Sequence, residues 1–202
     1  MAIKKDIEFL FEIGSMRFLE RTWKRFLNND FANVTEHTFR VMWISMMLAK
    51  YEKAKDINKV ILMALLHDVP ESRTGDVNYL YRCYTERKEK QAFDDIFRGT
   101  SMSEDIRVIW KEYEERKTLE SKIVKDADIL DVELELCEQR SKGDKIGEIW
   151  SKEREKKIKS QLHTKSAKKF WDEIRKADPH GWHLNGRNMF NDKKNCYINS
   201  EI

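Results

Sequence analysis

The sequence predicts an all-α protein, and three observations support this fold class. The 202 residues include only seven glycines and two prolines, too few for the many tight turns of an all-β protein. Hydrophobic residues make up 40% of the chain, and they recur at helical spacing along most of its length. Charged residues make up 37%, yet their signs nearly cancel to a net charge of +3, which is typical of helices with salt bridges on their exposed faces.

The first part of the chain is expected to form three helices. Residues 3–13 and 15–28 have the pattern of two short amphipathic helices that separate near Gly14. The third helix is expected to begin after Asn33, because Asn33 and Glu36 have the spacing of a capping box.

His37 lies on the apolar face of this third helix. Val41, Ile44 and Leu48 follow it at steps of four, three and four residues, the spacing of one helix face. The histidine is therefore expected to be buried, near the start of the helix.

A fourth helix is expected over residues 57–69, and two polar residues stand on its buried side. His67 and Asp68 follow six apolar residues, ILMALL at 61–66, and both continue apolar stripes, so both should point inward. Pro70 disfavours the α conformation at the residue before it, so the helix should end or kink there. An unpaired buried carboxylate is costly, so this junction requires a hydrogen-bonding partner, an ion pair or a metal.

The second half of the chain is expected to be helical as far as residue 176. Its longest apolar stripe lies in a helix of residues 118–141, and Asp128 and Asp131 flank this stripe. Further helices are expected over residues 85–98, 104–117, 145–162 and 164–176. From Asp178 onward, proline, glycine and asparagine interrupt any period, which predicts one domain of residues 1–177 and an irregular tail of residues 178–202.

The sequence also indicates a cytoplasmic protein that does not cross a membrane. No apolar run approaches the roughly 18 residues that a membrane-spanning helix needs, and the N-terminal residues carry charges unlike those of a signal peptide. Cys83, Cys137 and Cys196 are widely spaced and form no CxxC pair, as expected for reduced thiols.

Four polar residues on the predicted helices would form a metal site if those helices pack together. They are His37, His67, Asp68 and Asp128. Two imidazoles and two carboxylates suit one divalent ion, and these residue types leave its identity open among Mn, Co, Fe, Ni, Zn and Mg. Such an ion activates a bound water and offsets the charge of an anionic substrate, which points to hydrolytic chemistry.

Three segments of the sequence resemble the H…HD…D signature of the HD-domain phosphohydrolases. They are VTEHTFRV, ALLHDVPESRTGDV and KIVKDADIL. The closer resemblance is to the YfbR-like 5′-deoxynucleotidases, which show an Arg-Trp element and then [ST]-E-H, H-D-x-x-E, T-G-D and K-x-x-D. The matching residues occur in this order between residues 21 and 128. The resemblance implies an HD-domain helical bundle with one divalent metal among three core helices.

Carried over residue by residue, the resemblance assigns the metal to the same four residues, His37, His67, Asp68 and Asp128. Asp126 and Asp131 are the alternatives for the last ligand. Asp128 is favoured because Lys125 precedes it by three residues, as the K-x-x-D element requires.

The resemblance also implies roles for four residues around the metal. Glu71 would orient water or move a proton, and Asp76 would position water or protonate the leaving 5′ oxygen. The sequence does not decide which of the two is the general acid and which is the general base. Arg21 would hold the phosphate, and Trp23 would press on the sugar and exclude a ribose 2′-hydroxyl. The match is loose at this element, because Thr22 separates the two residues.

The expected function is metal-dependent hydrolysis of deoxyribonucleoside 5′-monophosphates by a homodimer, without a nucleic-acid or membrane partner. A deoxynucleoside triphosphate triphosphohydrolase shares the four-ligand signature and would use Arg73, Arg82 and Arg87 for a longer polyphosphate. A non-catalytic nucleotide- or RNA-binding HD module is the third alternative, supported by the basic residues of segment 151–169.

Overall fold

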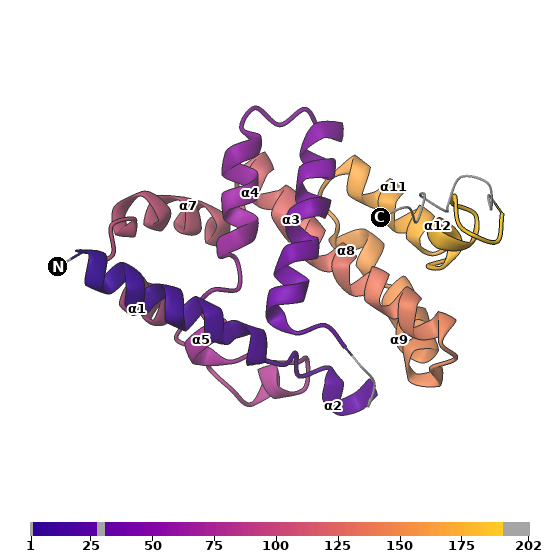
Figure 1. Cartoon of the computed structure of the whole chain (residues 1–202), viewed down its shortest axis with the longest axis horizontal. Helices are drawn as coiled ribbons and strands as arrows, with labels where there is room; N and C mark the ends of the chain where they lie inside the picture. The colour runs from indigo at the N-terminus through magenta and orange to yellow at the C-terminus, as the bar shows by residue number, and fades with distance from the viewer. Residues whose placement is uncertain (1, 28–30, 192–202) are drawn as a thin grey trace, which may run out of the picture.

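The computed structural model of the chain describes residues 2–27 and 31–191, and it is built mainly from helices (Figure 1). These described residues contain no β-strand, and an isolated bridge joins Glu20 to Asn33. The expected all-α class is confirmed.

Twelve α-helices and two short 3-10 turns follow one another through the described residues. They are α1 (Ala2–Ser15), η1 (Met16–Phe18), α2 (Lys24–Leu27), α3 (Val34–Tyr51), α4 (Ile57–Leu66), α5 (Glu71–Thr74), η2 (Tyr81–Cys83), α6 (Glu89–Phe97), α7 (Ser103–Glu115), α8 (Leu119–Ser141), α9 (Lys145–Glu155), α10 (Ile158–Gln161), α11 (Lys165–Ile174) and α12 (Gly181–Leu184). None of these helices is long and apolar enough to cross a membrane.

The main core lies where α3 and α4 pack against α8, the longest helix. Leu48, Val60, Ile123 and Leu130 are fully buried there. Helix α11 packs on α8 as well, and Figure 1 shows α8 between it and the α3–α4 pair. Burial of these apolar surfaces supplies the main driving force that holds the three central helices together.

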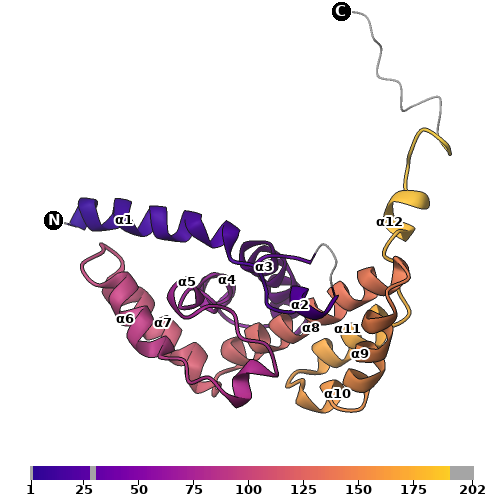
Figure 2. The same ribbon diagram turned by 90° about the horizontal axis from the view of Figure 1, so that it is seen from below.

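A second apolar cluster lies under α4, among α6, α7 and α1. Phe93 stacks on Trp110 with ring centroids 4.3 Å apart, and Phe9 of α1 packs against Phe97. Figure 2 shows these helices on one side of the molecule and α9, α10 and α11 on the other. The central helices therefore sit between two flanking groups.

The start of α3 agrees with its predicted cap. The Asn33 side chain accepts a hydrogen bond from the Glu36 amide at 2.9 Å, and the Glu36 carboxylate accepts one from the Asn33 amide at 3.0 Å. This capping box satisfies amide groups that have no partner within the helix. It places His37, which is fully buried, within the first turn of α3.

The predicted helix over residues 15–28 is wrong. The chain instead forms η1, leaves helical geometry at Leu19 (φ −84°, ψ 99°), and becomes helical again only at α2. In between, both the amide and the hydroxyl of Thr22 donate hydrogen bonds to the carboxylate of Asp76. This tertiary contact replaces the helix that the apolar period favours, because local propensity is a weak determinant beside specific contacts.

Helix α4 ends earlier than the predicted residue 69. His67 is its C-terminal capping residue, and α5 begins at Glu71, directly after Pro70. A proline has no amide hydrogen to continue a helix, so the break occurs beside it. The turn leaves both His67 and Asp68 facing the centre of the molecule.

Two further expectations differ from the structure in the second half of the chain. The expected helix over residues 145–162 is divided into α9 and α10, and the expected irregular tail contains the short helix α12. Trp182 and Phe190 in this tail are more than three-quarters exposed. The division between a domain of residues 1–177 and a tail of residues 178–202 stays a prediction.

Asp126 fixes the start of α11 against α8. Its buried carboxylate accepts hydrogen bonds from the amides of His163 and Thr164, both at 2.8 Å, and from the Thr164 hydroxyl at 2.7 Å. It therefore points away from the other candidate metal ligands. Its assignment as an alternative ligand is not supported by this geometry.

Replacing this residue should destabilise the whole fold. Asp126→Ala leaves three donors without their acceptor, and we expect the free energy of unfolding to fall by about 2–4 kcal/mol. Urea denaturation followed by circular dichroism measures the change. Asp172→Ala on α11 is the control, since Asp172 forms only a partly exposed pair with Lys159 and should lose less than about 1 kcal/mol. Equal losses in the two variants would contradict this role.

Candidate metal centre

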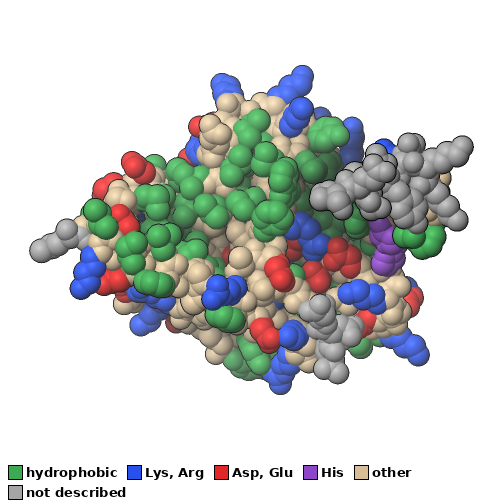
Figure 3. Space-filling model, in the orientation of Figure 1, with side chains coloured by type: hydrophobic (Ala, Val, Ile, Leu, Met, Phe, Trp, Pro, Cys, Tyr) green, Lys and Arg blue, Asp and Glu red, His purple; other side chains and the backbone are tan. Residues whose placement is uncertain are grey.

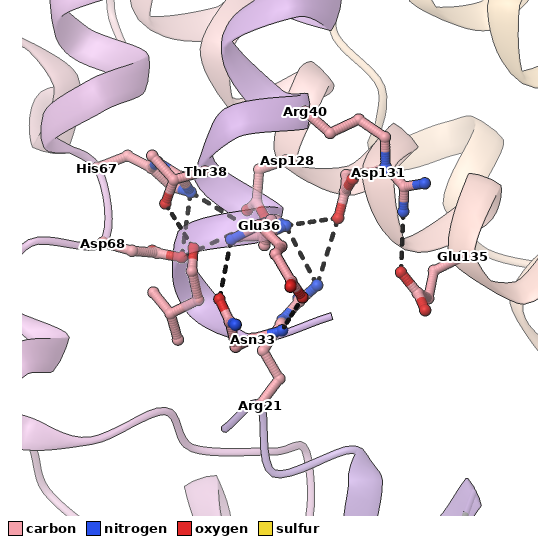
Figure 4. Close-up of polar contacts among 12 residues, drawn as sticks. Arg21, Asn33, Glu36, Thr38, Arg40, His67, Asp68, Asp128, Asp131 and Glu135 are labelled. Carbon is pink, nitrogen blue, oxygen red and sulfur yellow. Dashed lines mark hydrogen bonds and ion pairs between the residues drawn. The ribbon is translucent and has the colours of Figure 1, made fainter. Parts of the chain in front are cut away.

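Four side chains from three segments direct their polar atoms to one point at the centre of the molecule. His37 Nε2 lies 3.3 Å from His67 Nε2, and 3.4 Å from both Asp68 Oδ2 and Asp128 Oδ1. His67 Nε2 lies 3.1 Å from Asp68 Oδ2. Figure 4 shows His67, Asp68 and Asp128 turned toward one another beside α3. These are the four ligands predicted from the sequence.

The spacing of these atoms fits a single divalent cation. Ligand atoms about 2.1 Å from a shared ion lie roughly 3.0 to 3.4 Å apart at octahedral or tetrahedral angles. The ligand atoms of His37, His67 and Asp128 all lie within 4.8 Å of one another. Asp68 Oδ2 lies 3.1 to 3.4 Å from the two imidazole Nε2 atoms, which falls in this range. The two imidazoles are almost completely buried, whereas Asp68 and Asp128 retain about a fifth of their side-chain exposure. An ion held here would therefore be open on the carboxylate side.

Both histidines are oriented by hydrogen bonds on their other ring nitrogen. His67 Nδ1 lies 2.7 Å from the carbonyl oxygen of Ala64, so it donates its proton there. His37 Nδ1 lies 2.5 Å from Asp131 Oδ2. In each ring this arrangement leaves Nε2 directed at the common point, where the neutral ring would offer its lone pair to a metal, as in many carboxylate–histidine–metal arrangements.

The electrostatics of the cluster favour a positive charge at this point. Burial opposes ionisation of Asp68, but the neighbouring histidines lower the pKa of its carboxyl group. Burial also opposes ionisation of Asp128, but Lys125, 2.7 Å away, and the histidines hold its pKa well below the usual value. Despite burial and a nearby arginine, the surrounding carboxylates raise the pKa of His37 well above its usual value. A divalent cation supplies the charge that these carboxylates attract.

Asp131 lies behind His37 and outside the ring of potential ligands. Its completely buried carboxylate bonds His37, the guanidinium of Arg21 at 3.3 Å, and Nε of Arg40. Arg40 also pairs with Glu135 at 2.9 Å, which Figure 4 shows on the side away from the cluster. Asp131, an alternative ligand in the sequence, is therefore held by two arginines in a position that orients His37.

Arg40 was not identified from the sequence as a residue of the site. Its position three residues after His37 does place it on the same side of the helix as that histidine. Residues three apart share a helix face, so an arginine there was available to the same carboxylate. Charged residues are common on helices, and this spacing alone does not distinguish a buried ion pair from an exposed one.

Glu71 lies near the cluster, at the start of α5, and is almost completely buried. Burial, with the nearby charges of Asp68 and Asp76, raises the pKa of its carboxyl group to about 9, although Arg87 opposes the change. Arg87 donates to Glu71 Oε1 at 2.8 Å and to the carbonyl oxygen of Gly75 at 3.2 Å. A carboxyl group with this pKa is suited to hold a proton at neutral pH.

Asp76 has a structural partner that the sequence did not predict. Its Oδ2 accepts hydrogen bonds from the amide of Thr22 at 2.5 Å and from the Thr22 hydroxyl at 2.8 Å. Asp76 therefore anchors the residue that separates Arg21 from Trp23. Asp76 also lines the cavity in front of the candidate metal cluster, and its role in the reaction stays a prediction.

This cavity has a volume of about 910 Å³ and reaches from the cluster to the surface. Arg21 and Trp23 both line it, so the structure brings both predicted substrate-binding residues to the same opening as the cluster. Of the arginines considered for a longer polyphosphate, Arg82 and Arg87 line the cavity, whereas Arg73 pairs with Glu12 on α1.

Arg116, Lys125, Arg154 and Lys157 also line the cavity. The lining thus holds seven cationic and seven acidic side chains, and two of the acids, Asp68 and Asp128, belong to the candidate metal cluster. With a divalent metal bound by that cluster, the net positive charge of the lining would suit an anionic ligand.

Comparison with protein families and curated proteins agrees with this geometry. The family model described as HD domain matches residues 13–171. The 5′-deoxynucleotidase HDDC2 of Dictyostelium discoideum is 33% identical over 144 residues, which cover 65% of this chain and 76% of that protein. The human 5′-deoxynucleotidase HDDC2 is 26% identical over 151 residues, covering 71% and 72% of the two chains.

Solved structures share the fold. A conserved hypothetical protein from Pyrococcus furiosus aligns with a TM-score of 0.68 and 23% identity, covering 85% of this chain and 99% of that one. A "predicted metal-dependent phosphohydrolase" from Magnetospirillum magnetotacticum aligns with a TM-score of 0.66 and 20% identity, covering 87% and 91%. The resemblance found in the sequence motifs is confirmed by the family match over most of the chain. The protein belongs to the HD-domain family.

Proposed function

We propose that this protein is a metal-dependent 5′-deoxynucleotidase, which hydrolyses deoxyribonucleoside 5′-monophosphates to deoxynucleosides and phosphate. The observation that carries the proposal is the convergence of two histidines and two aspartates at the wall of a cavity that Arg21 and other cationic side chains help to line. The HDDC2 relatives support the substrate class, since they are named 5′-deoxynucleotidases and align with about three-quarters of their length.

The metal would be held by His37, His67, Asp68 and Asp128, with Asp131 orienting the first of them. When bound, a divalent ion lowers the pKa of a coordinated water and neutralises phosphate charge. The ligand types suit Mn, Co, Fe, Ni, Zn or Mg. The protein's own contribution is to fix the ligand geometry and to keep one side open to the cavity.

Arg21 would bind the phosphate next to the metal. Its guanidinium lies 3.1 Å from His37 Nδ1 and 3.3 Å from Asp131, while the residue also lines the cavity. A guanidinium has five N–H donors, so contacts with the protein leave others for phosphate oxygens. Trp23, two residues along, would lie against the sugar.

Glu71 and Asp76 would assist proton transfer. The raised pKa of Glu71 supports a proton-holding role, and Arg87 positions its carboxyl group by donating a hydrogen bond to Oε1 at 2.8 Å. Asp76 would face the leaving 5′ oxygen while its Oδ2 holds Thr22.

A deoxynucleoside triphosphate is a second candidate substrate. The observation that favours it is that Arg82, Arg87 and Arg116 line the same cavity and could meet a longer polyphosphate. Binding without catalysis is less favoured, because decay of the active site would be expected to remove a ligand, and all four candidate ligands are present and converge.

We also propose a homodimer. Phe39, Trp43, Met47 and Tyr51 recur at every fourth residue of α3 and are 49–69% exposed. Figure 3 shows hydrophobic side chains gathered over this part of the surface. A second copy of the chain would bury this stripe, since apolar patches of this kind mark interaction surfaces. The cytoplasmic location stays a prediction.

The main test is substrate-resolved phosphate release. Metal-stripped protein refilled with Mn, Co or Mg should release phosphate from dAMP but not from AMP, because Trp23 against the sugar would leave no space for the 2′-hydroxyl. Trp23→Ala should then reduce the ratio of the rates of phosphate release from dAMP and from AMP. The metal-stripped protein is the control and should be inactive. Tripolyphosphate release from dATP would favour the second candidate, and inactivity with metal bound would favour a binding module.

Asp131 should control metal affinity without binding the metal. Asp131→Asn preserves shape but replaces the charged acceptor of His37, and we expect metal affinity to fall about 10- to 100-fold. Competition with a chromophoric chelator measures it. Glu138→Gln is the matched control, because Glu138 also pairs with Arg40 but has no contact with His37. Unchanged affinity in Asp131→Asn would remove this residue from the metal site.

Glu71 should be needed for turnover and not for metal binding. Glu71→Ala should lower kcat about 10²- to 10⁴-fold, the usual contribution of a positioned acid or base. Metal content by atomic emission should stay at the wild-type level. Glu12→Ala, which breaks an ion pair with Arg73 outside the cavity, should leave kcat unchanged. Wild-type turnover in Glu71→Ala would exclude it from proton transfer.

A further inference from the structure

The cavity is larger than a phosphate group and its metal would fill. Pockets for small molecules have volumes of about 300–1000 Å³, and this one has about 910 Å³. Beyond the cluster its wall includes three aromatic side chains, Trp23, Tyr79 and Trp150. They come from the segment before α2, the segment before η2, and α9.

These rings form one continuous group. The Trp23 centroid lies 4.8 Å from that of Trp150, with the rings perpendicular, and 6.0 Å from that of Tyr79. Tyr79 and Trp150 are also 6.0 Å apart. Such edge-to-face pairs hold aromatic rings in definite positions.

The exposure of this group differs from that of core residues. Tyr79 is 54% exposed, and Trp23 and Trp150 are half-buried. By contrast, Trp110 in the second apolar cluster is almost completely buried against Phe93. The three rings therefore leave surface open to the cavity, which core packing does not require.

Ion pairs and hydrogen bonds of the residues that follow Trp150 hold this part of α9 in place. Arg154 Nε donates to Glu133 at 2.6 Å, and the Glu133 side chain is only 2% exposed. The guanidinium of Arg154 also lies 5.9 Å from the Trp23 ring. Arg175 bonds the hydroxyl and carbonyl oxygens of Ser151, the residue next to Trp150. The aromatic wall is therefore formed before any ligand binds.

Arg21, Trp23 and Trp150 follow one another along the cavity wall in the order in which phosphate, sugar and base follow one another in a nucleotide. Arg21 touches the side chains at the metal cluster, Trp23 follows it by two residues, and Trp150 packs against Trp23. A phosphate at Arg21 and a sugar at Trp23 would carry the base toward Tyr79 and Trp150.

We propose that Trp150, together with Tyr79 and Trp23, forms a stacking subsite for the nucleobase. This subsite rests on the proposed function, and it extends the binding site to α9, outside the motif-bearing segment. Every base has a π-face, so stacking recognises a nucleobase as a class more than one particular base. Trp150 is thus a specificity-determining residue for nucleotides over other phosphate esters of similar size.

The test compares a substrate that has a base with one that lacks it. Trp150→Ala should raise KM for dAMP about tenfold or more, the usual effect of losing one stacked base, and leave KM for 2-deoxyribose 5-phosphate unchanged. Trp150→Phe should restore most of the affinity for dAMP. Trp182→Ala is the control, because Trp182 is 80% exposed on α12. Circular dichroism checks that each variant is folded.

Equal KM changes for both substrates would assign Trp150 a structural role and overturn the subsite, as would no change for either. If the wild-type protein hydrolyses neither substrate, the proposed function fails while the subsite can still be measured. Isothermal titration with deoxyadenosine then decides: about tenfold weaker binding by Trp150→Ala supports the subsite, and equal binding by the two proteins overturns it.

Discussion

The contact between Asp131 and His37 is the interaction on which the rest of the structure depends. It joins α8 to α3 at the point where the two helices cross, and both side chains are completely buried. The same carboxylate binds Arg21 from the segment before α2 and Arg40 from α3. One buried aspartate therefore fixes the crossing of the central helices, the orientation of a candidate metal ligand and the position of a candidate phosphate-binding residue.

Burying several charged side chains close together is costly in folding free energy unless each of them has a partner of opposite charge. Removing one partner of a buried ion pair leaves an uncompensated charge, which is far more destabilising than the loss of a surface pair. Here Asp131 meets two arginines, and Arg40 in turn meets Glu135 and Glu138. His37 and Asp131 are completely buried at the inner end of this network, whereas Arg40 and Glu138 at its outer end are 28% and 40% exposed. The network therefore runs from the back of the site to the surface.

Much of the fold and the ligand set could be predicted from the sequence, because both depend on local patterns. The cap at Asn33 and the stripe through His37 set the start and face of α3, and Pro70 marks where the chain turns after Asp68. The partners of Asp131, Asp126 and Asp76 could not be predicted in this way. They lie between 37 and 110 residues away in the chain, and only the packed helices bring them together.

The hydrogen bonds between Thr22 and Asp76 have a consequence for enzyme kinetics. A short non-helical segment carries Arg21 and Trp23, and Asp76 bonds both the amide and the hydroxyl of the residue between them. Substitutions at Thr22, Trp23 and Asp76 therefore change the same hydrogen-bonded segment. Their effects on the activation free energy should be coupled and not additive. If Trp23 and Asp76 have the roles proposed for them, sugar discrimination and leaving-group chemistry would therefore depend on the same pair of hydrogen bonds.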